Sequence, residues 1–291
     1  MSGGGPTGPD PRAIAWIDAP APDGTWGDPD QLSLPLNDRG LLLADGLFET
    51  VLIQAGCPRL LAEHLGRWQA AAASLGLAAP PGADRVLPLL SEAVARSGLC
   101  GDGALRLNWS RGSGGGQRGL ALPGPGEPQG RHRFWLQLSP WTRASTPLAV
   151  IVSRLERRNS GSLVSRCKTF AYAGAIQALR EARAAGADDA LLLGGGGDLC
   201  CGTSANLLVR RGAGWITPPL ASGCLPGVMR GRALALGLAC EGRLVLADLL
   251  ASEGALLINS LGCRPIRRCE GRDLPLPSGA EDLWEQLLAS S

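Results

Sequence analysis

Near the middle of the chain of 291 residues, the stretch between Ser139 and Pro147 loses the regular spacing of apolar residues. On either side of this stretch, apolar residues recur at the spacings of short strands and amphipathic helices. A chain of this length can form two domains of ordinary size. We therefore expect a linker at 139–147, between an N-terminal α+β domain at 12–138 and a C-terminal domain of α/β type at 148–291. Residues 1–11, which are polar and rich in Gly and Pro, are predicted to be a disordered tail.

The N-terminal half alternates between strand and helix patterns. Leu65, Trp68, Ala72 and Leu75 have the spacing of one helix face. The Gly-rich segment at 111–119 is predicted to be a loop, and it lacks the Lys-Ser/Thr pair that ends a phosphate-binding P-loop. The predicted elements are strands at 46–53, 104–109 and 132–138 and helices at 62–75 and 84–96.

The C-terminal half carries more strand patterns around two helix patterns. Gly186 is expected to end the first of these helices, because glycine readily takes the left-handed conformation found after helix ends. Two of the strands, at 190–193 and 206–209, are expected to flank a tight, Gly-rich turn. The predicted elements are strands at 148–152, 190–193, 206–209 and 255–259 and helices at 169–185 and 227–236.

The composition argues against several classes of function. The net charge of +2 and the scattered arginines give no basis for a nucleic-acid partner. No apolar run is long enough to span a bilayer, so no membrane partner is expected and a cytoplasmic location is predicted. The nine cysteines include no C-x-x-C pair, and there are only two histidines, so we expect no metal site.

Lys168 is the only lysine in the chain; the other basic residues in the Lys+Arg total of 28 are arginines. Arginine can replace lysine on a solvated surface, but it cannot act as a nucleophile because its guanidinium stays protonated. A primary amine is needed for Schiff-base formation with a carbonyl compound. Tyr172, the only tyrosine, lies four residues later and would share a helix face with Lys168. The alternative is that Lys168 has no chemical role and has survived by chance in a chain that otherwise uses arginine.

A turn at 224–227 leads directly into the helix predicted at 227–236. The first N–H groups of a helix have no partner within the helix and can hold an anion. The backbone N–H groups of Gly227, Val228 and Met229 are therefore candidates for binding a phosphate. A purely structural turn is the alternative.

Several blocks of sequence, taken in order, resemble the class IV aminotransferases, the fold-type IV enzymes that use pyridoxal phosphate. No single block is decisive, but their order and spacing across 34–267 are a strong signal. The blocks are Asn37-Asp38-Arg39-Gly40, Asp45-Gly46-Leu47-Phe48-Glu49-Thr50, His64-Leu65-Gly66-Arg67, Arg166-Cys167-Lys168-Thr169, Gly202-Thr203-Ser204-Ala205-Asn206, Gly227-Val228-Met229-Arg230 and Ile258-Asn259-Ser260.

The resemblance implies a two-domain fold like that of D-amino-acid aminotransferase, pyridoxal 5'-phosphate as cofactor, and a homodimer. It implies that Lys168 is the catalytic residue, which holds the cofactor covalently and moves a proton at the substrate carbon. It also implies that Arg67 binds the cofactor phosphate together with the N–H groups of Val228 and Met229. Tyr172 and Asn206 are implied to be further cofactor contacts.

One position departs from the family pattern. The resemblance implies a glutamate facing the pyridine nitrogen of the cofactor, five residues before Asn206, but Cys201 stands there. A carboxylate keeps that nitrogen protonated and makes the ring a strong electron sink, whereas a neutral thiol does not. We expect this change to favour an elimination over a full transamination. The alternatives are that Glu253 substitutes for the missing glutamate, or that the protein is impaired.

Within the family, 4-amino-4-deoxychorismate lyase is the enzyme class whose reaction is an elimination. The resemblance therefore implies a lyase that acts on a small molecule and forms 4-aminobenzoate and pyruvate for folate synthesis. Arg39, Arg111 and Asn259 are candidates for binding the substrate. A branched-chain or D-amino-acid aminotransferase is the first alternative, and a non-catalytic relative is the second.

Overall fold

The computed structural model describes residues 11–18, 23–113, 120–122, 131–212 and 214–289. The chain divides into two compact units, Met1–Thr142 and Arg143–Ser291. The predicted tail at 1–11 lies outside the described residues except for its last position. The division falls within the stretch at 139–147, although the last strand of the first unit extends to Pro140.

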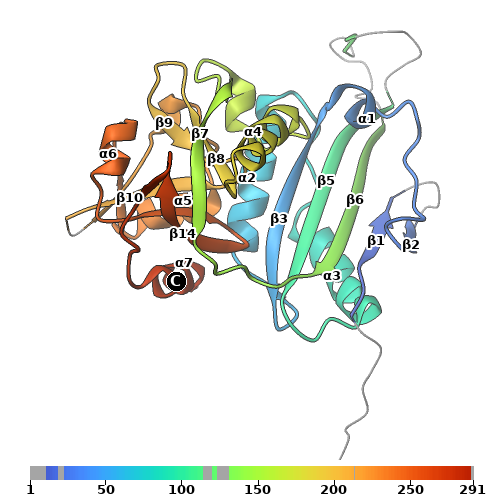
Figure 1. The fold of residues 1–291 in the computed structure, drawn as a ribbon. Helices are drawn as coiled ribbons and strands as arrows, with labels where there is room; N and C mark the ends of the chain where they lie inside the picture. Colours follow the sequence, from blue (N-terminus) through green and yellow to red (C-terminus); the bar gives the residue numbers. More distant parts are fainter. Residues whose placement is uncertain (1–10, 19–22, 114–119, 123–130, 213, 290–291) are drawn as a thin grey trace, which may run out of the picture. The chain divides into compact units, whose positions relative to one another are not determined.

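The first unit is one antiparallel sheet with helices on one of its faces (Figure 1). Its strand order is β2-β1-β6-β5-β3-β4, and helices α2 and α3 pack against β3 and β6. The elements are β1 (Ile14–Ile17), β2 (Thr25–Gly27), α1 (Arg39–Leu43), β3 (Gly46–Gln54), β4 (Cys57–Pro58), α2 (Leu61–Ser74), α3 (Ala83–Ser97), β5 (Gly103–Ser113) and β6 (Arg131–Pro140).

The core of the first unit lies between the sheet and α2 and α3. Trp16, Trp68 and Phe134 are each at most 2% exposed, and the Phe134 ring lies 5.5 Å from Trp16 and 6.0 Å from Trp68 between centroids. The strands and helices predicted for this half are present as β3, β5, β6, α2 and α3, which confirms the prediction. The short elements α1, β1, β2 and β4 were not predicted, because they carry too few residues to show a spacing.

The predicted loop at 111–119 is wrong at its start. β5 continues through Ser113, and its register with β6 shifts between Ser110 and Ser113. Gly112 makes this bulge possible, because its φ of 70° is a left-handed conformation and a Cβ there would overlap the carbonyl oxygen of Arg131. The remainder of the loop, 114–119, lies outside the described residues.

A buried carboxylate fastens α2 to the sheet. Glu49, in the otherwise apolar interior of β3, is 1% exposed. Its carboxylate accepts hydrogen bonds from Arg67 Nε at 2.8 Å and Arg67 Nη2 at 2.5 Å, and it lies 2.7 Å from His64 Nδ1. Burial alone would raise the pKa of Glu49, but the charge of Arg67 and the hydrogen bonds of both partners lower it to about 2.

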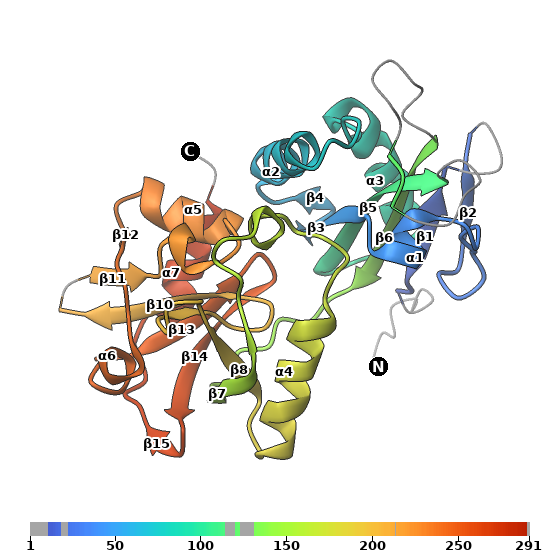
Figure 2. The ribbon, with the colours of Figure 1, turned by 90° about the horizontal axis from the view of Figure 1, so that it is seen from above.

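The second unit is built on a closed mixed sheet. The strands β10, β13, β14, β7, β8 and β9 follow one another, and β9 also pairs with β10, which closes a small barrel. Helix α4 packs along β7 and β8 (Figure 2). The strands are β7 (Leu148–Arg157), β8 (Asp189–Leu193), β9 (Leu199–Cys201), β10 (Asn206–Arg211), β11 (Gly214–Thr217), β12 (Ala239–Glu241), β13 (Ala255–Asn259), β14 (Gly262–Cys269) and β15 (Arg272–Asp273).

The helices of the second unit pack around this barrel. α5 contacts α7 and β13, and α7 also contacts β14. Leu191, Leu207 and Ile266 are fully buried members of the barrel core. The helices are η1 (Leu163–Arg166), α4 (Ala173–Ala184), η2 (Leu220–Ser222), α5 (Val228–Ala235), α6 (Leu246–Leu250) and α7 (Ala280–Leu288).

Two predictions for the second unit need correction. The helix predicted at 169–185 begins at Ala173, because Ala171 N donates to the Thr169 hydroxyl and this local turn competes with helix. The strands at 190–193 and 206–209 do not simply flank a turn, because β9 lies between them and pairs with both. The end of α4 agrees with the prediction, since Gly186 has a φ of 71°.

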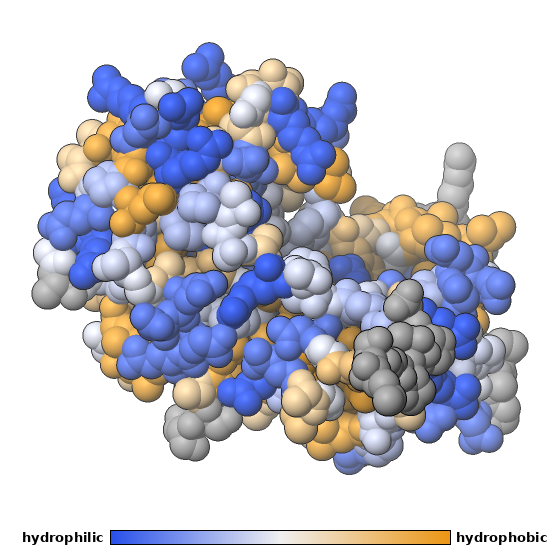
Figure 3. All heavy atoms as spheres, turned by 60° about the horizontal axis from the view of Figure 1, so that its bottom comes forward, coloured by the Kyte–Doolittle hydropathy of each residue, from blue (hydrophilic) through white to orange (hydrophobic). Residues whose placement is uncertain are grey.

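In the part of the chain that the structure describes, no helix is long and apolar enough to cross a membrane. Several large apolar side chains are nevertheless exposed, and Leu36, Leu42 and Leu120 are more than half exposed. On the face that Figure 3 draws, hydrophobic residues (orange) form small groups among hydrophilic ones (blue).

The depressed pKa of Glu49 predicts an acid-sensitive contribution to stability. Because the folded-state pKa lies below the ordinary value of 4.5, the contribution is fully present above pH 4.5 and is lost as the pH falls toward about 2. Glu49→Gln should therefore lower the free energy of unfolding by about 3 kcal/mol at pH 7, because it leaves Arg67 and His64 without their buried anion. The difference from wild type should shrink between pH 4.5 and 2.

Urea unfolding of both proteins between pH 2 and 7 measures this difference. Glu92→Gln is the matched control, because Glu92 forms an exposed pair with Arg96 on α3, and its loss should cost less than about 1 kcal/mol. If Glu49→Gln lowers the free energy of unfolding by the same amount at pH 7 and at pH 2, the charge of the carboxylate is not the cause of the lost stability.

Candidate cofactor and active site

Lys168 and Tyr172 meet in the segment that enters α4. Lys168 Nζ lies 3.2 Å from the Tyr172 hydroxyl and 5.6 Å from the centroid of its ring. They do not share a helix face as predicted, because Tyr172 is the N-cap residue of α4 and Lys168 precedes the helix. The local turn at Thr169, rather than helical spacing, therefore brings the amine and the phenol together.

The N-terminus of α5 presents backbone donors. Gly227 is its N-cap residue and makes no side-chain cap, and the first hydrogen bond within the helix runs from Gly231 N to Gly227 O. The N–H groups of Val228 and Met229 thus have no partner within the helix, and the helix dipole favours an anion beside them. The side chains of Val228 and Met229 are both buried, so this end of α5 is packed into the second unit.

Asn206 closes this turn from the barrel side. Its Nδ2 donates to Leu225 O at 3.0 Å, and a Cβ added to Gly227 would overlap Asn206 Oδ1. Glycine is therefore required at 227 for the turn to approach the start of β10. Asn206 holds the candidate anion-binding turn in place through this side-chain hydrogen bond, and its predicted contact with a cofactor stays a prediction.

The loop before this turn is held at further points. Ser222 Oγ donates to the buried carboxylate of Asp198. The Cys224 thiol lies 3.6 Å from the carbonyl oxygens of both Pro218 and Pro219. These contacts tie the loop that leads to α5 to the rest of the second unit.

Cys201 lies in an apolar environment at the end of β9. It is 8% exposed, and its backbone pairs with Leu192 on one side and Asn206 on the other. The surrounding cluster contains Ala178, Ala190 and the thiols of Cys200 and Cys224. Hydrogen bonds with Cys201 and Cys224, and burial, raise the pKa of Cys200.

Glu253 does not take the place of the missing glutamate. Its carboxylate accepts a hydrogen bond from Gly212 N at 3.0 Å. Gly212 follows the last residue of β10, whereas Cys201 pairs with Asn206 at the first. At about 3.3 Å per residue the two positions are about 20 Å apart along the strand.

Asn259 lies beside Asn206 on the same rim of the barrel. Its Nδ2 donates to Ser204 O at 3.3 Å, and its Oδ1 accepts from Leu261 N at 2.9 Å. The register pairs Asn206 with Ile258, the residue before Asn259. The structure thus brings Asn259 close to the candidate cofactor contacts, and its role toward a substrate stays a prediction.

In the first unit, Arg67 has a fixed orientation, because Glu49 occupies one edge of its guanidinium through Nε and Nη2. The side chain is 13% exposed. The remaining candidates for cofactor binding all belong to the second unit, so the predicted phosphate contact of Arg67 stays a prediction.

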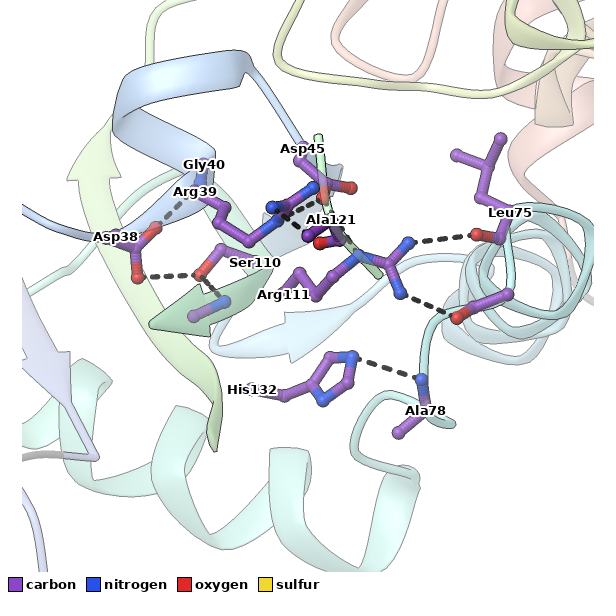
Figure 4. A network of polar contacts seen from close by, with 12 residues as sticks. Asp38, Arg39, Gly40, Asp45, Leu75, Ala78, Ser110, Arg111, Ala121 and His132 are labelled. Carbon is purple, nitrogen blue, oxygen red and sulfur yellow. Dashed lines mark hydrogen bonds and ion pairs between the residues drawn. The ribbon is translucent and has the colours of Figure 1, made fainter. Parts of the chain in front are cut away.

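Arg39 and Arg111, predicted as substrate contacts, bind one carboxylate within the first unit (Figure 4). Asp45 Oδ2 accepts from Arg39 Nε and from Arg111 Nε, each at 2.8 Å. Burial opposes ionisation of Asp45, but hydrogen bonds from Arg111 and Arg39 lower its pKa. Arg111 also donates to Gly76 O at 2.7 Å and Leu75 O at 3.0 Å. These contacts join β5, the end of α2 and the segment after α1, and the role of the two arginines toward a substrate stays a prediction.

Two residues that position candidate site groups were not predicted. Glu49 had a visible signal, because it is a charged residue inside a strand that is mostly apolar and mostly buried. Arg158, which contacts both the segment before Lys168 and the loop before α5, had no local signal among so many arginines. No group of three or more His, Cys, Asp or Glu residues within the described ranges is arranged to hold a metal ion.

The residues of the second unit fit pyridoxal phosphate. Its aldehyde requires an amine, and Lys168 is the one lysine of the chain. Its phosphate requires several donors in a confined turn, and the glycine turn closed by Asn206 at the start of α5 supplies them. Nothing in the first unit is needed for this part of the fit.

Comparison with known proteins agrees with this arrangement. Residues 46–269 match the family model for amino-transferase class IV. The chain is 28% identical to a bifunctional aminodeoxychorismate lyase and D-amino acid transaminase of Mycobacterium tuberculosis, over 89% of this chain and 93% of that protein.

Two solved structures share the architecture. A fold IV transaminase from Curtobacterium pusillum is 25% identical, with a TM-score of 0.81 over 96% of this chain and all of that one. A hypothetical aminotransferase from Mycobacterium tuberculosis, solved with pyridoxal phosphate bound, is 25% identical, with a TM-score of 0.79 over 94% of this chain and 97% of that chain. The two-unit fold with its small barrel confirms the predicted fold-type IV architecture, and the chain belongs to the class IV aminotransferase family.

Proposed function

We propose that this protein binds pyridoxal 5'-phosphate at Lys168 and is a lyase that converts 4-amino-4-deoxychorismate into 4-aminobenzoate and pyruvate. The observation that carries the proposal is the combination of a lone lysine beside Tyr172 with a buried thiol, Cys201, where the family pattern has a carboxylate. The bifunctional relative from Mycobacterium tuberculosis carries lyase and transaminase activities in its name, so both reactions are compatible with this family.

In the proposed site, Lys168 has two tasks. Its amine anchors the cofactor, and after release by the substrate amine it takes a proton from the substrate ring carbon. The Tyr172 hydroxyl, 3.2 Å away, orients the amine between these tasks. The first N–H groups of α5 hold the phosphate, and Arg67 is proposed as a further phosphate contact. Bound pyridoxal phosphate supplies an electron sink for the charge that develops at the substrate.

The proposed reaction is balanced without any other reactant. The ring C–H bond breaks as Lys168 takes the proton, and the C–O bond to the enolpyruvyl group breaks with its electron pair. The leaving enolate is protonated to pyruvate, and the ring becomes aromatic. No oxidant or reductant is consumed, and aromatisation supplies the driving force.

Two other functions have a specific basis. A D-amino-acid or branched-chain aminotransferase is the first, because such transfer is the general activity of the family. A non-catalytic relative is the second, because Cys201 replaces the expected glutamate. Lys168 is evidence against a non-catalytic relative, because an Arg-rich chain has kept its one lysine at the position where the family needs an amine.

Replacement of Lys168 tests the catalytic proposal. Lys168→Ala and Lys168→Arg should each lower formation of fluorescent 4-aminobenzoate by about 10²–10⁴-fold or more, since they remove both the anchor and the proton acceptor. Borohydride reduction of the wild type with pyridoxal phosphate, followed by peptide mapping, should label the peptide that contains Lys168. Transfer of an amino group to 2-oxoglutarate without any aminobenzoate would assign the aminotransferase instead, and an unlabelled Lys168 would favour the non-catalytic relative.

Cys201 tests the choice between elimination and transfer. Cys201→Glu should raise side transamination relative to lyase turnover by about tenfold, since a charge-assisted hydrogen bond is worth about 1.5–3 kcal/mol. Cys201→Ser is the matched control, because a hydroxyl is neutral and should leave the ratio near that of wild type. Circular dichroism checks that both variants fold. An equal ratio in all three proteins would refute the role proposed for the thiol.

A homodimer remains part of the proposal, as the family resemblance implies. Sedimentation equilibrium of the purified protein should give twice the chain mass of 30.0 kDa. A mass of one chain across micromolar concentrations would contradict it.

A further inference from the structure

Arg158 connects two segments of the second unit that carry different parts of the candidate site. It follows directly after β7, and its backbone N–H continues the pairing of β7 with β8 by donating to Leu193 O at 2.8 Å. Its Nε donates to Gly223 O at 3.0 Å, and its Nη2 donates to Ser165 O at 2.7 Å. One guanidinium edge thus bridges two backbone carbonyls from segments far apart in the sequence.

The first of these segments leads to Lys168. Ser165 lies in η1, three residues before the lysine, and its hydroxyl donates to Asn159 O at 2.7 Å. Cys167 N donates to Val164 O at 3.1 Å, which closes the turn directly before the lysine. The position of Ser165 O therefore helps to set the position of the segment at 165–168, which ends at Lys168.

The second segment leads to the anion-binding turn of α5. Gly223 lies four residues before Gly227, and its φ of 98° is a conformation that favours glycine. A Cβ at Gly223 would lie 3.1 Å from Arg158 Cβ and 3.1 Å from Ser160 Cα. The loop backbone is thus packed directly against the Arg158 segment, with no room for a side chain between them.

Only arginine has the geometry for this bridge. Its guanidinium is planar and always charged, and its Nε and Nη2 donors point in parallel from one edge. A lysine ammonium could reach one carbonyl, but it would not hold two at a fixed separation. Hydrogen bonds from charged donors are also the stronger ones.

We propose that Arg158 is a positioning residue that sets the spacing between the Lys168 segment and the anion-binding turn at the start of α5, and so determines how tightly the cofactor is held. The inference rests on the proposed function, because it assumes that pyridoxal phosphate uses both places. Arg158 itself takes no part in proton transfer.

The test compares Arg158→Gln and Arg158→Lys with two controls. Arg157→Gln changes the exposed arginine next to it. Leu274→Ala creates a cavity in the core of the same unit and provides a loss of stability unrelated to the bridge. Hydrogen–deuterium exchange of peptides covering 160–168 and 220–231 is measured without cofactor, and the Kd for pyridoxal phosphate is measured by absorbance titration.

Arg158→Gln should speed exchange in both segments and raise the Kd by about tenfold or more, the effect of losing about 1.4 kcal/mol. Arg158→Lys should recover little of this loss, because it restores the charge without the bridge. Ethylguanidinium added to Arg158→Ala should restore part of the affinity. Arg157→Gln should match wild type, and Leu274→Ala should not loosen the two segments selectively.

The inference is overturned if Arg158→Gln binds pyridoxal phosphate as wild type does, or if its two segments exchange no faster than those of Leu274→Ala. Failure of the proposed function looks different. In that case the wild-type protein itself does not bind pyridoxal phosphate and carries no label on Lys168, which contradicts both proposals.

Discussion

The closure of the barrel by β9 is the constraint on which the candidate site depends. This strand has only three residues, yet it pairs with β8 on one side and with the start of β10 on the other. A sheet edge left open there would expose unpaired backbone groups. Closing it places Cys201 beside Asn206, and Asn206 in turn holds the turn at the start of α5 through Leu225 O. The rim that results carries Cys201 and Asn206 and supports the turn at the start of α5.

Within each unit, arginine takes part in several of the charged contacts among the described residues. Arg67 pairs with the buried carboxylate of Glu49, and Arg39 and Arg111 share Asp45. Arg158 bridges two loops through their carbonyl oxygens. Each of these sites uses a planar guanidinium with several donors, which lysine cannot reproduce. Arginine thus fills the structural roles of a cation in this chain. The one lysine offers a primary amine that arginine cannot supply, which is why a chemical role is proposed for Lys168.

The longer elements could be predicted from the sequence because their apolar residues recur at regular spacings or in continuous runs. β3 is mostly apolar and mostly buried, and the apolar runs at 207–209 in β10 and 255–258 in β13 are buried in the closed barrel. Short elements such as α1 and β9 carry too few residues for a spacing to show. The bulge at Gly112 and the late start of α4 depend on single local contacts, which no spacing pattern reports.

The same limit applies to the candidate site. Lys168 could be found because it is unique, and the turn before α5 because glycine and a helix start are local signals. The carboxylate partner of Arg67 and the bridge made by Arg158 join residues that are distant in sequence. In an Arg-rich chain the residue type itself carries no information about which arginine is buried. Arg39 and Arg111 illustrate this, since their sequence context suggested a substrate and their side chains meet Asp45.

The environment of Cys201 bears on which reaction the site can perform. Cys201 belongs to a buried cluster with Ala178, Ala190 and Leu192, and a carboxylate in its place would need a charged partner to offset the cost of burial. A thiol carries no such cost, so the apolar cluster and the cysteine are consistent with one another. Transamination requires a deep electron sink that holds charge until a proton returns to the cofactor. An elimination that ends in an aromatic ring needs the sink only until the leaving group departs. In the proposed site, the thiol therefore weakens the electron sink, on which the lyase reaction depends less than transamination does. This difference is the reason for proposing the lyase rather than the transferase.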